Sequence, residues 1–461
     1  PVLLLLIFFA SQMAMGQHST KRNLTQADYH LWHTLSLEAI SDDGNWVSYR
    51  HYYEDTDTLF VHNRKSKKVL SFAKATLGTF KGNYYVSGTS DGLVHIVSLK
   101  KGSVKIVKGV QQFNAYGSFV ITQQQIDNEN ITVILNYDGK EIHRSSHLLE
   151  YQVSPDEQFI SMVKREDTMN AFVLLSTNGF VATELLKQPI DEGLFSMMKW
   201  STGNSAVALY DTKGTVAKIH YYHVGRRVLH TLSSAFEGFP LSMNFYARAE
   251  LNLSADGNRV FFKIRQKPEL NVDRPANGVQ VWNTDDPQIY PLSIVTEGYT
   301  QNPKYAMWEP LGNRFLEITD TDYPVGGTGG NSTLALVYNP LTYCAGDKFV
   351  HDADLYITDL SKNAPPKLMA KNVIGGSTNV FVSPTGKYVC YFEQGQWKVY
   401  TVATGVTTTV TATIPVSFSI ESMTEPDENS YGHPGWSVDD AHILVYDEFD
   451  VWKIKPDGSR I

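Results

Sequence analysis

The chain of 461 residues contains only two cysteines, Cys344 and Cys390. Their spacing is not that of a cysteine metal site, so we expect no metal and no cofactor. An exported protein permits a disulfide between them, and they lie in neighbouring repeat units, so pairing is geometrically feasible. A buried free thiol at Cys390 is the alternative, and the sequence leaves both open.

The chain also lacks an excess of basic residues. It has 40 Lys and Arg against 48 Asp and Glu, and a formal net charge of −8 at pH 7. The charges are spread along the sequence, without the basic patch that binds nucleic acid or an anionic membrane surface. We therefore expect no nucleic-acid partner.

The apolar run at residues 2–10 is too short to span a bilayer, which needs about 20 residues. Followed by the small residues Ala14 and Gly16 before Gln17, it is typical of a secretory signal peptide. The initiator Met and the basic residues that normally precede such a core are missing, so we expect residues 1–16 to be a signal peptide truncated at its start. No cysteine follows the core, which argues against a lipoprotein anchor. We predict an exported bacterial protein, periplasmic or extracellular, with no membrane anchor.

What the sequence does contain is a recurring turn followed by a strand. Asp, Ser and Pro favour a turn, Gly supplies the positive φ that closes it, and the aromatic or β-branched residues that follow favour a strand. The copies begin at Ser41, Ser154, Ser201, Ser254, Glu309 (within residues 308–315), Ser383 and Ser437, with degenerate copies at residues 80–84 and 116–119.

The spacing of these copies predicts the fold. The degenerate copies divide the first long step into thirds of about 40 residues, which is the period of a four-stranded propeller blade. We predict an all-β chain that forms a β-propeller of about seven or eight four-stranded blades. We expect it to be incomplete at the C-terminus, because nothing marks an end at Ile461. A β-sandwich is the alternative, but it would not repeat so many times.

Three segments follow from these patterns. Residues 1–16 are the signal peptide, residues 17–35 an N-terminal helical segment, and residues 36–461 the propeller. Thr25 can cap a short amphipathic helix that has Asp28 in its first turn. We expect this helix to pack on an apolar surface.

The glycine-containing motifs do not identify an active site. Ser90 lies in a G-x-S-x-G pattern, but an alternating strand pattern follows it where a nucleophile elbow needs a helix, so we interpret it as a hairpin turn. Residues 326–330 lack the Lys and Ser/Thr of a phosphate-binding loop, and we interpret them as a flexible loop. They belong to the most loop-like stretch, residues 320–331, where we expect binding contacts because long loops on rigid repeats often carry function.

The histidine and carboxylate pairs give no site either. His220 and His223 are three apart in a strand, so they face opposite sides and would not share a metal. The adjacent carboxylates at residues 166–167 and 439–440 lie in turns, where we expect water to solvate both charges, so they do not indicate a site. Residues 41–46 resemble the aspartate box of sialidases but are one residue short between Asp and Trp. We predict no catalytic, cofactor-binding or metal-binding residue in this chain.

Several stretches resemble secreted prolyl-oligopeptidase-like (S9) serine peptidases. Residues 28–32 followed by 40–49 resemble the start of the mature region in that family. Residues 382–392, with 397–405, are similar to a late propeller blade of the family, and residues 431–452 to the next one.

The resemblance implies a propeller that covers a C-terminal α/β-hydrolase domain, with Ser, Asp and His in that order, beyond residue 461. The propeller would narrow access so that peptides reach the active site and folded proteins do not. The dipeptidyl-peptidase branch holds the substrate's amino terminus with adjacent Glu residues, and this chain has no Glu-Glu pair.

The expected function is therefore the non-catalytic propeller portion of an exported serine peptidase, whose peptide substrates are cut in the missing domain. One alternative is a stand-alone periplasmic binding or scaffold propeller of the tricorn or Tol type. Another is a propeller glycosidase, which would need acidic residues converging on the central channel.

Overall fold

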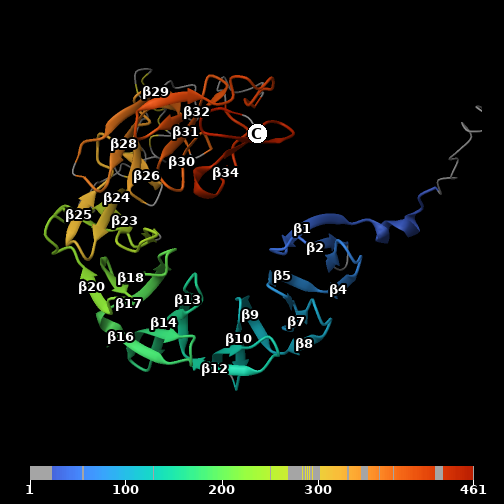
Figure 1. Cartoon of the computed structure of the whole chain (residues 1–461). Coiled ribbons are helices and arrows are strands. Elements are labelled where there is room, and N and C mark those ends of the chain that lie inside the picture. The colour runs from blue at the N-terminus through green and yellow to red at the C-terminus, as the bar shows by residue number, and fades with distance from the viewer. Residues whose placement is uncertain are drawn as a thin grey trace, which may run out of the picture. The chain divides into compact units, whose positions relative to one another are not determined.

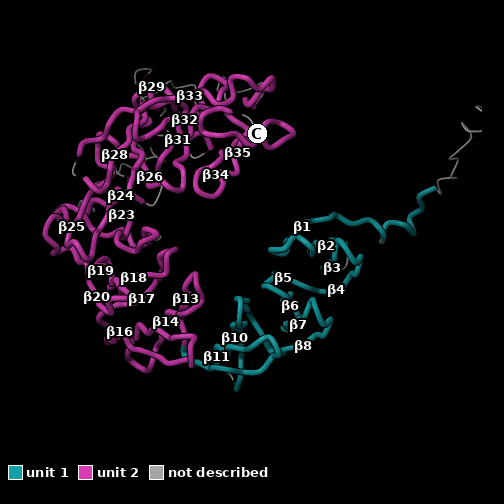
Figure 2. The backbone as a smooth tube through the Cα atoms, in the orientation of Figure 1, with its two compact units in different colours: residues 1–147 teal, residues 148–461 magenta. Residues whose placement is uncertain are grey.

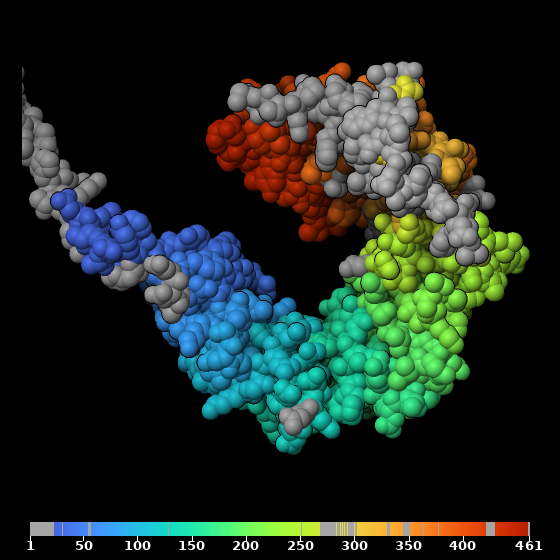
Figure 3. All heavy atoms as spheres, turned by 180° about the vertical axis from the view of Figure 1, so that it is seen from behind, coloured from blue at the N-terminus to red at the C-terminus, as the bar shows by residue number. Residues whose placement is uncertain are grey.

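The structure is a computed structural model, and its described residues are coloured in Figure 3. It describes residues 23–53, 57–127, 129–249, 251–267, 302–329, 332–343, 351–362, 364–376, 378–420 and 429–459, with single residues at 283, 286, 288, 290, 293 and 299. The predicted signal peptide at residues 1–16 lies outside them, as does Cys344, so the choice between a Cys344–Cys390 disulfide and a free thiol at Cys390 stays open.

The chain divides into two compact units, residues 1–147 and 148–461 (Figure 2). Both are built almost entirely from β-strands (Figure 1). Within the described residues, no helix is long and apolar enough to cross a membrane.

The first unit contains a short 3-10 helix, η1 (Gln26–Leu31), and three four-stranded antiparallel sheets. The strands of these sheets are β1 (Thr34–Ile40), β2 (Trp46–Tyr52), β3 (Asp57–Asn63) and β4 (Val69–Ala73); β5 (Ala75–Lys81), β6 (Tyr84–Thr89), β7 (Val94–Ser98) and β8 (Val104–Val107); and β9 (Val110–Ala115), β10 (Val120–Ile126), β11 (Glu129–Leu135) and β12 (Glu141–Ser146).

The described residues of the second unit form six sheets and two 3-10 helices, η2 (Ile190–Glu192) and η3 (Val438–Asp440). The strands of its first three sheets are β13 (Leu148–Val153), β14 (Phe159–Glu166), β15 (Met169–Ser176) and β16 (Ala182–Pro189); β17 (Leu194–Trp200), β18 (Ala206–Lys213), β19 (Val216–His223) and β20 (Val228–Leu232); and β21 (Met243–Phe245), β22 (Asn252–Leu253), β23 (Val260–Gln266), β24 (Lys304–Glu309) and β25 (Arg314–Glu317). The strands of its last three sheets are β26 (Val325–Gly329), β27 (Leu334–Tyr338), β28 (Asp352–Asp359) and β29 (Lys367–Ile374); β30 (Val380–Val382), β31 (Tyr388–Glu393), β32 (Gln396–Thr401) and β33 (Val406–Thr409); and β34 (Gly435–Trp436), β35 (Ile443–Tyr446) and β36 (Val451–Ile454).

Within each sheet, every strand pairs with the next one in sequence, except that β21 and β22 both pair with β23. Successive antiparallel meanders of this kind are propeller blades. The fold is all-β and of the β-propeller type, as the sequence predicted.

The described residues form nine sheets, where about seven or eight blades were predicted. The sequence copy at residues 308–315 spans the end of β24, the turn and the start of β25, so it does not begin a new sheet. The sheet β26–β29 went unrecognised, because its first turn lacks the repeated sequence pattern.

Alternating side chains of one strand explain how the sheets of the second unit pack together. In β18, Ala206, Ala208 and Tyr210 belong to one core, which they share with residues of β23 and β24. The intervening residues Val207 and Leu209 belong to a different core, which they share with residues of β14 and β15. Because side chains alternate between the two faces of a strand, the sheet β17–β20 is buried on both faces.

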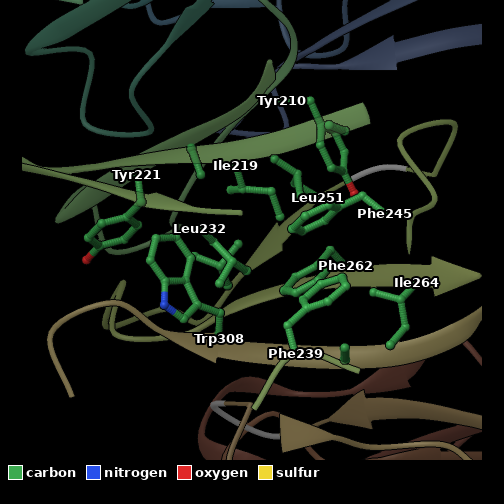
Figure 4. Close-up of a cluster of buried hydrophobic side chains, with 14 of the residues drawn as sticks. Tyr210, Ile219, Tyr221, Leu232, Phe239, Phe245, Leu251, Phe262, Ile264 and Trp308 are labelled. Atoms are coloured by element: carbon green, nitrogen blue, oxygen red, sulfur yellow. The ribbon is translucent and has the colours of Figure 1, made fainter. Parts of the chain in front are cut away.

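Trp308 is the largest side chain in the first of these cores (Figure 4). Its side chain is 2% exposed, and its ring meets that of Tyr221 edge-on, with ring centroids 6.1 Å apart. Tyr221 comes from β19 and Trp308 from β24, so this contact joins two neighbouring sheets. The conspicuous sequence at residues 308–315 is therefore a core strand and its turn.

The repeated Ser-containing turn connects the first and second strands of a sheet, and its hydrogen bonds explain the sequence pattern. The hydroxyl of Ser41 donates to Asp43 (2.6 Å) and accepts the N–H of Trp46 (2.9 Å). The carboxylate of Asp43 also accepts the N–H of Asn45 (3.0 Å). These bonds, those of Ser41 first, lower the pKa of Asp43 to about 2. Ser154 with Asp156, and Ser254 with Asp256, repeat the same arrangement.

At Ser383 the carboxylate of this turn comes from another sheet. Thr385 occupies the position of the aspartate, and the hydroxyl of Ser383 donates instead to Asp440 (2.8 Å), which lies in the turn between β34 and β35. Asp440 also accepts the backbone N–H of Thr385 (3.1 Å) and its hydroxyl. Asp440 is buried, so the prediction that solvation explains residues 439–440 was wrong for this residue.

The prediction of a flexible loop at residues 326–330 was wrong for the residues that the structure describes. Residues 325–329 form β26, which pairs with β27. A Cβ on Gly329 would lie 2.2 Å from the Cβ of Val382, and one on Gly326 would lie 2.8 Å from the carbonyl oxygen of Leu336. Glycine is required here because the neighbouring strands approach too closely for a side chain.

The N-terminal helix is shorter than predicted. Asp28 accepts the backbone N–H of Thr25 (2.8 Å), as the predicted cap requires. The helix is a 3-10 helix, however, and the chain enters β1 at Thr34, where pairing with β2 satisfies its backbone. Leu31 and Trp32 are more than half exposed, so the expected packing on an apolar surface is not seen among the described residues.

Replacing Asp440 tests the bond between sheets. Asp440→Asn keeps a side chain that tolerates positive φ but loses an acceptor, so unfolding free energy should fall by about 1–3 kcal/mol. Asp439→Asn is the matched control, because Asp439 has the same backbone conformation and an exposed side chain. Urea unfolding curves measure both changes. Equal stability of the two variants would contradict the role of Asp440.

Removing the Trp308 side chain tests the core between sheets. Trp308→Ala should lower the unfolding free energy by about 3–5 kcal/mol, since it leaves a cavity. Trp32 is 57% exposed, and Trp32→Ala should change stability by less than about 0.5 kcal/mol. Thermal and urea unfolding compare the two, and a Trp308 effect as small as the control's would show that the packing is wrong.

Candidate functional site

Ser90 lies on the turn between β6 and β7, so the predicted hairpin is confirmed. Its backbone N–H donates to the carbonyl oxygen of Lys74 (3.0 Å), and the neighbouring Thr89 hydroxyl bonds to Asp91. A strand follows Ser90, so this sequence does not form a nucleophile elbow.

The stretch at residues 320–331 is not the long loop that was expected to bind ligands. Asp320 accepts the backbone N–H groups of Asp322 (2.9 Å) and Tyr323 (2.8 Å), which makes a tight turn, and β26 begins at Val325. Residues 330 and 331 lie outside the described part.

The carboxylate pair at residues 166–167 and the sialidase-like stretch have structural roles. Glu166 forms an exposed ion pair with Lys187 (2.9 Å). Asp167 lies at positive φ in the turn after β14. Residues 41–46 form the Ser41 turn described above. Among the described residues, no group of three or more His, Cys, Asp or Glu side chains could hold a metal ion.

His220 has polar partners on both ring nitrogens. Its Nε2 lies 3.3 Å from the Oδ2 of Asp211 on β18, and its Nδ1 lies 2.8 Å from the Oγ1 of Thr231 on β20. His223 lies near the end of the same strand, where its Nδ1 accepts the N–H of Arg226 (3.2 Å). The two histidines thus have different partners. We call Asp211, His220 and Thr231 the relay.

The relay combines buried and exposed groups. Asp211 is 3% exposed and His220 is 5% exposed, whereas Thr231 is exposed on the last strand of its sheet. The ring of Phe195 meets the imidazole edge-on at 5.8 Å and closes one side of it. A solvent-accessible hydroxyl is therefore backed by a buried imidazole, which is backed in turn by a buried carboxylate.

Residues of the neighbouring sheet hold Asp211 in place. The side-chain amide of Gln188 on β16 donates to its Oδ1 (2.9 Å). A Cβ on Gly193 would lie 2.0 Å from that same oxygen, so only glycine fits there. Asn170 on β15 donates to the carbonyl oxygen of Gly193 (2.7 Å) and fixes the backbone at this point.

The charge state of Asp211 determines the proton positions. Burial acts to raise the pKa of Asp211, but the hydrogen bonds from His220 and Gln188 outweigh it, so the pKa lies below its usual value. The carboxylate is ionised at neutral pH and accepts a hydrogen bond from Nε2–H of the imidazole. Nδ1 then faces the Thr231 hydroxyl as a hydrogen-bond acceptor.

The sequence prediction missed the relay. His220 was considered only together with His223, while its partners are on the strands to either side. Thr231 lies directly opposite His220 in the β19–β20 register. Asp211 pairs with Lys218, two residues before His220 on the same face. A polar residue on the same face of three consecutive strands was the available signal.

No protein-family model matches the chain, and no curated protein matches it. Solved structures with a similar fold include a tricorn protease (11% identity, TM-score 0.36, covering 80% of this chain and 38% of that one). A eukaryotic initiation factor (11%, 0.43, 87% and 92%) and the propeller domain of the Trilobed protease from Pyrococcus furiosus (9%, 0.32, 74% and 99%) are also similar. The chain thus spans 38% of the length of the tricorn protease.

Substituting Gly193 tests the support of the relay. Gly193→Ala should displace the Asp211 carboxylate, because the added Cβ would clash with its Oδ1. The displacement disturbs a buried polar network, so the unfolding free energy should fall by about 1–3 kcal/mol. Gly225→Ala, in the β19–β20 turn of the same sheet, is the control, because its added Cβ would lie 3.6 Å or more from its neighbours. Unfolding curves compare the two. A Gly193 variant as stable as the control would contradict the close approach.

Proposed function

We propose that these 461 residues are the non-catalytic propeller portion of an exported serine peptidase. A hydrolase domain encoded beyond residue 461 would cut the peptides, and the propeller would restrict which substrates reach it. The observation that carries this proposal is the resemblance of residues 382–405 and 431–452 to consecutive late blades of prolyl-oligopeptidase-like peptidases.

The local structure of those two stretches supports the proposal. The first contains β31 and β32, and the second contains β34, β35 and the start of β36, so each lies in its own sheet. The bonds from Ser383 and Thr385 to Asp440 join these two sheets. The two resembling stretches are thus successive, directly bonded blades, which is the order that the resemblance requires.

The coding sequence beyond Ile461 is the most direct test. We expect a strand, a G-x-S-x-G motif and a helix, followed by an Asp and a His in that order. A stop codon soon after Ile461 would overturn the proposal and favour a stand-alone binding or scaffold propeller.

Peptide hydrolysis tests the division of roles. The complete protein should cleave short peptides and leave intact the folded proteins that contain the same peptide sequences. The 461-residue chain should cleave neither. Mass spectrometry of the peptide products measures this. In the 461-residue chain, Ser90→Ala should make no difference, and peptide cleavage that disappears with this substitution would show that Ser90 is a nucleophile.

A further inference from the structure

The relay places an accessible hydroxyl beside a base that is already oriented. Nδ1 of His220 lies 2.8 Å from Thr231 Oγ1, within the range in which a general base accepts a proton. The opposite nitrogen points to an ionised carboxylate at 3.3 Å, which stabilises the imidazolium that proton uptake would form.

We propose that Thr231 is a reactive nucleophile that takes up acyl groups from activated esters. This is a chemical property of the propeller itself and goes beyond the peptidase role proposed above. The ligand class is a small, electron-poor ester, because the hydroxyl lies at the open side of an outer strand.

The reaction balances within the relay. Thr231 Oγ1 forms a bond to the acyl carbon while its proton passes to Nδ1 of His220. The bond between the acyl carbon and the leaving oxygen then breaks, and the alcohol departs with the proton returned by Nδ1. The product is a threonine ester and a neutral imidazole. Attack by water, with the same proton path, would regenerate the free hydroxyl.

A purely structural role explains the relay less well. Thr231 is exposed and could bond to water, so it does not need the imidazole as a partner. A buried ionised carboxylate with an imidazole is often no more stable than a well-packed apolar pair. The network nevertheless includes Gln188 and a glycine that leaves room for Asp211. Groups whose positions are fixed to this degree are common at reactive sites.

The control threonine is in the neighbouring sheet. Thr183 lies on β16, which is the last strand of its sheet just as β20 is, and it is also exposed. In the part of the chain that the structure describes, no histidine is bonded to it. Thr183 and Thr231 therefore share their strand position and exposure and differ in the adjacent base.

The test is acetylation of the 461-residue chain with p-nitrophenyl acetate, followed by peptide mapping. We expect one acetyl group on Thr231 and about a hundredfold slower labelling in His220→Gln, the usual scale of a general-base contribution. Asp211→Asn should also slow labelling, because the imidazole loses the carboxylate that orients it. Thr183→Ala should label at the original rate.

Two variants separate reactivity from folding. Thr231→Ser keeps the hydroxyl and should keep the adduct, whereas Thr231→Val removes it and should abolish the adduct. Both changes are at an exposed position, so circular dichroism should show unchanged folding. Labelling of Thr183 at the same rate as Thr231, or undiminished labelling in a folded His220→Gln variant, would overturn the proposal.

Discussion

The packing of each sheet against its neighbours is the constraint on which the structure of the second unit depends. A single strand, β18, contributes its even-numbered residues 206–210 to one core and the odd-numbered residues between them to another. The sheet β17–β20 therefore packs against a partner on each face, and most residues of its middle strands are buried. This explains why the central strands read as continuous apolar runs and why aromatic residues fill the spaces between sheets.

Turns make several of the polar contacts between sheets of the second unit. The turn at residues 201–206 donates from Gly203 to the carbonyl oxygen of Ala255 (3.0 Å) and from Ser205 to that of Asp256 (2.7 Å), both in the turn of the next sheet. The Asp440 carboxylate makes the equivalent connection for Ser383. The repeated motif thus closes its own hairpin and also links it to an adjacent one. The motif recurs in the same form because it closes a hairpin and bonds to a neighbouring turn.

The sequence was informative wherever a turn and its strand are specified locally. The Ser41, Ser154 and Ser254 turns follow from residue type, because Ser, Asp and a residue at positive φ satisfy the hairpin without help. The same reasoning failed at residues 326–329, where glycine normally indicates a loop. There the decisive fact is the close approach of Gly329 to Val382, which is distant in sequence, and of Gly326 to Leu336 on the paired strand β27. It failed at Asp440 for the same reason, since its partners are more than fifty residues away.

The relay shows why the candidate site was harder to predict than the fold. Asp211, His220 and Thr231 each occupy an ordinary strand position, and only the register of three strands brings them together. In a sheet whose two faces are buried, a polar side chain must find its partner on the adjacent strand or lose stability. The outer strand is the exception, because its side chains can reach solvent. The relay begins in the core at Asp211 and ends on the outer strand at Thr231, so it connects a buried charge to the surface. This connection gives Thr231 a reactivity that Thr183, at the equivalent strand position, lacks.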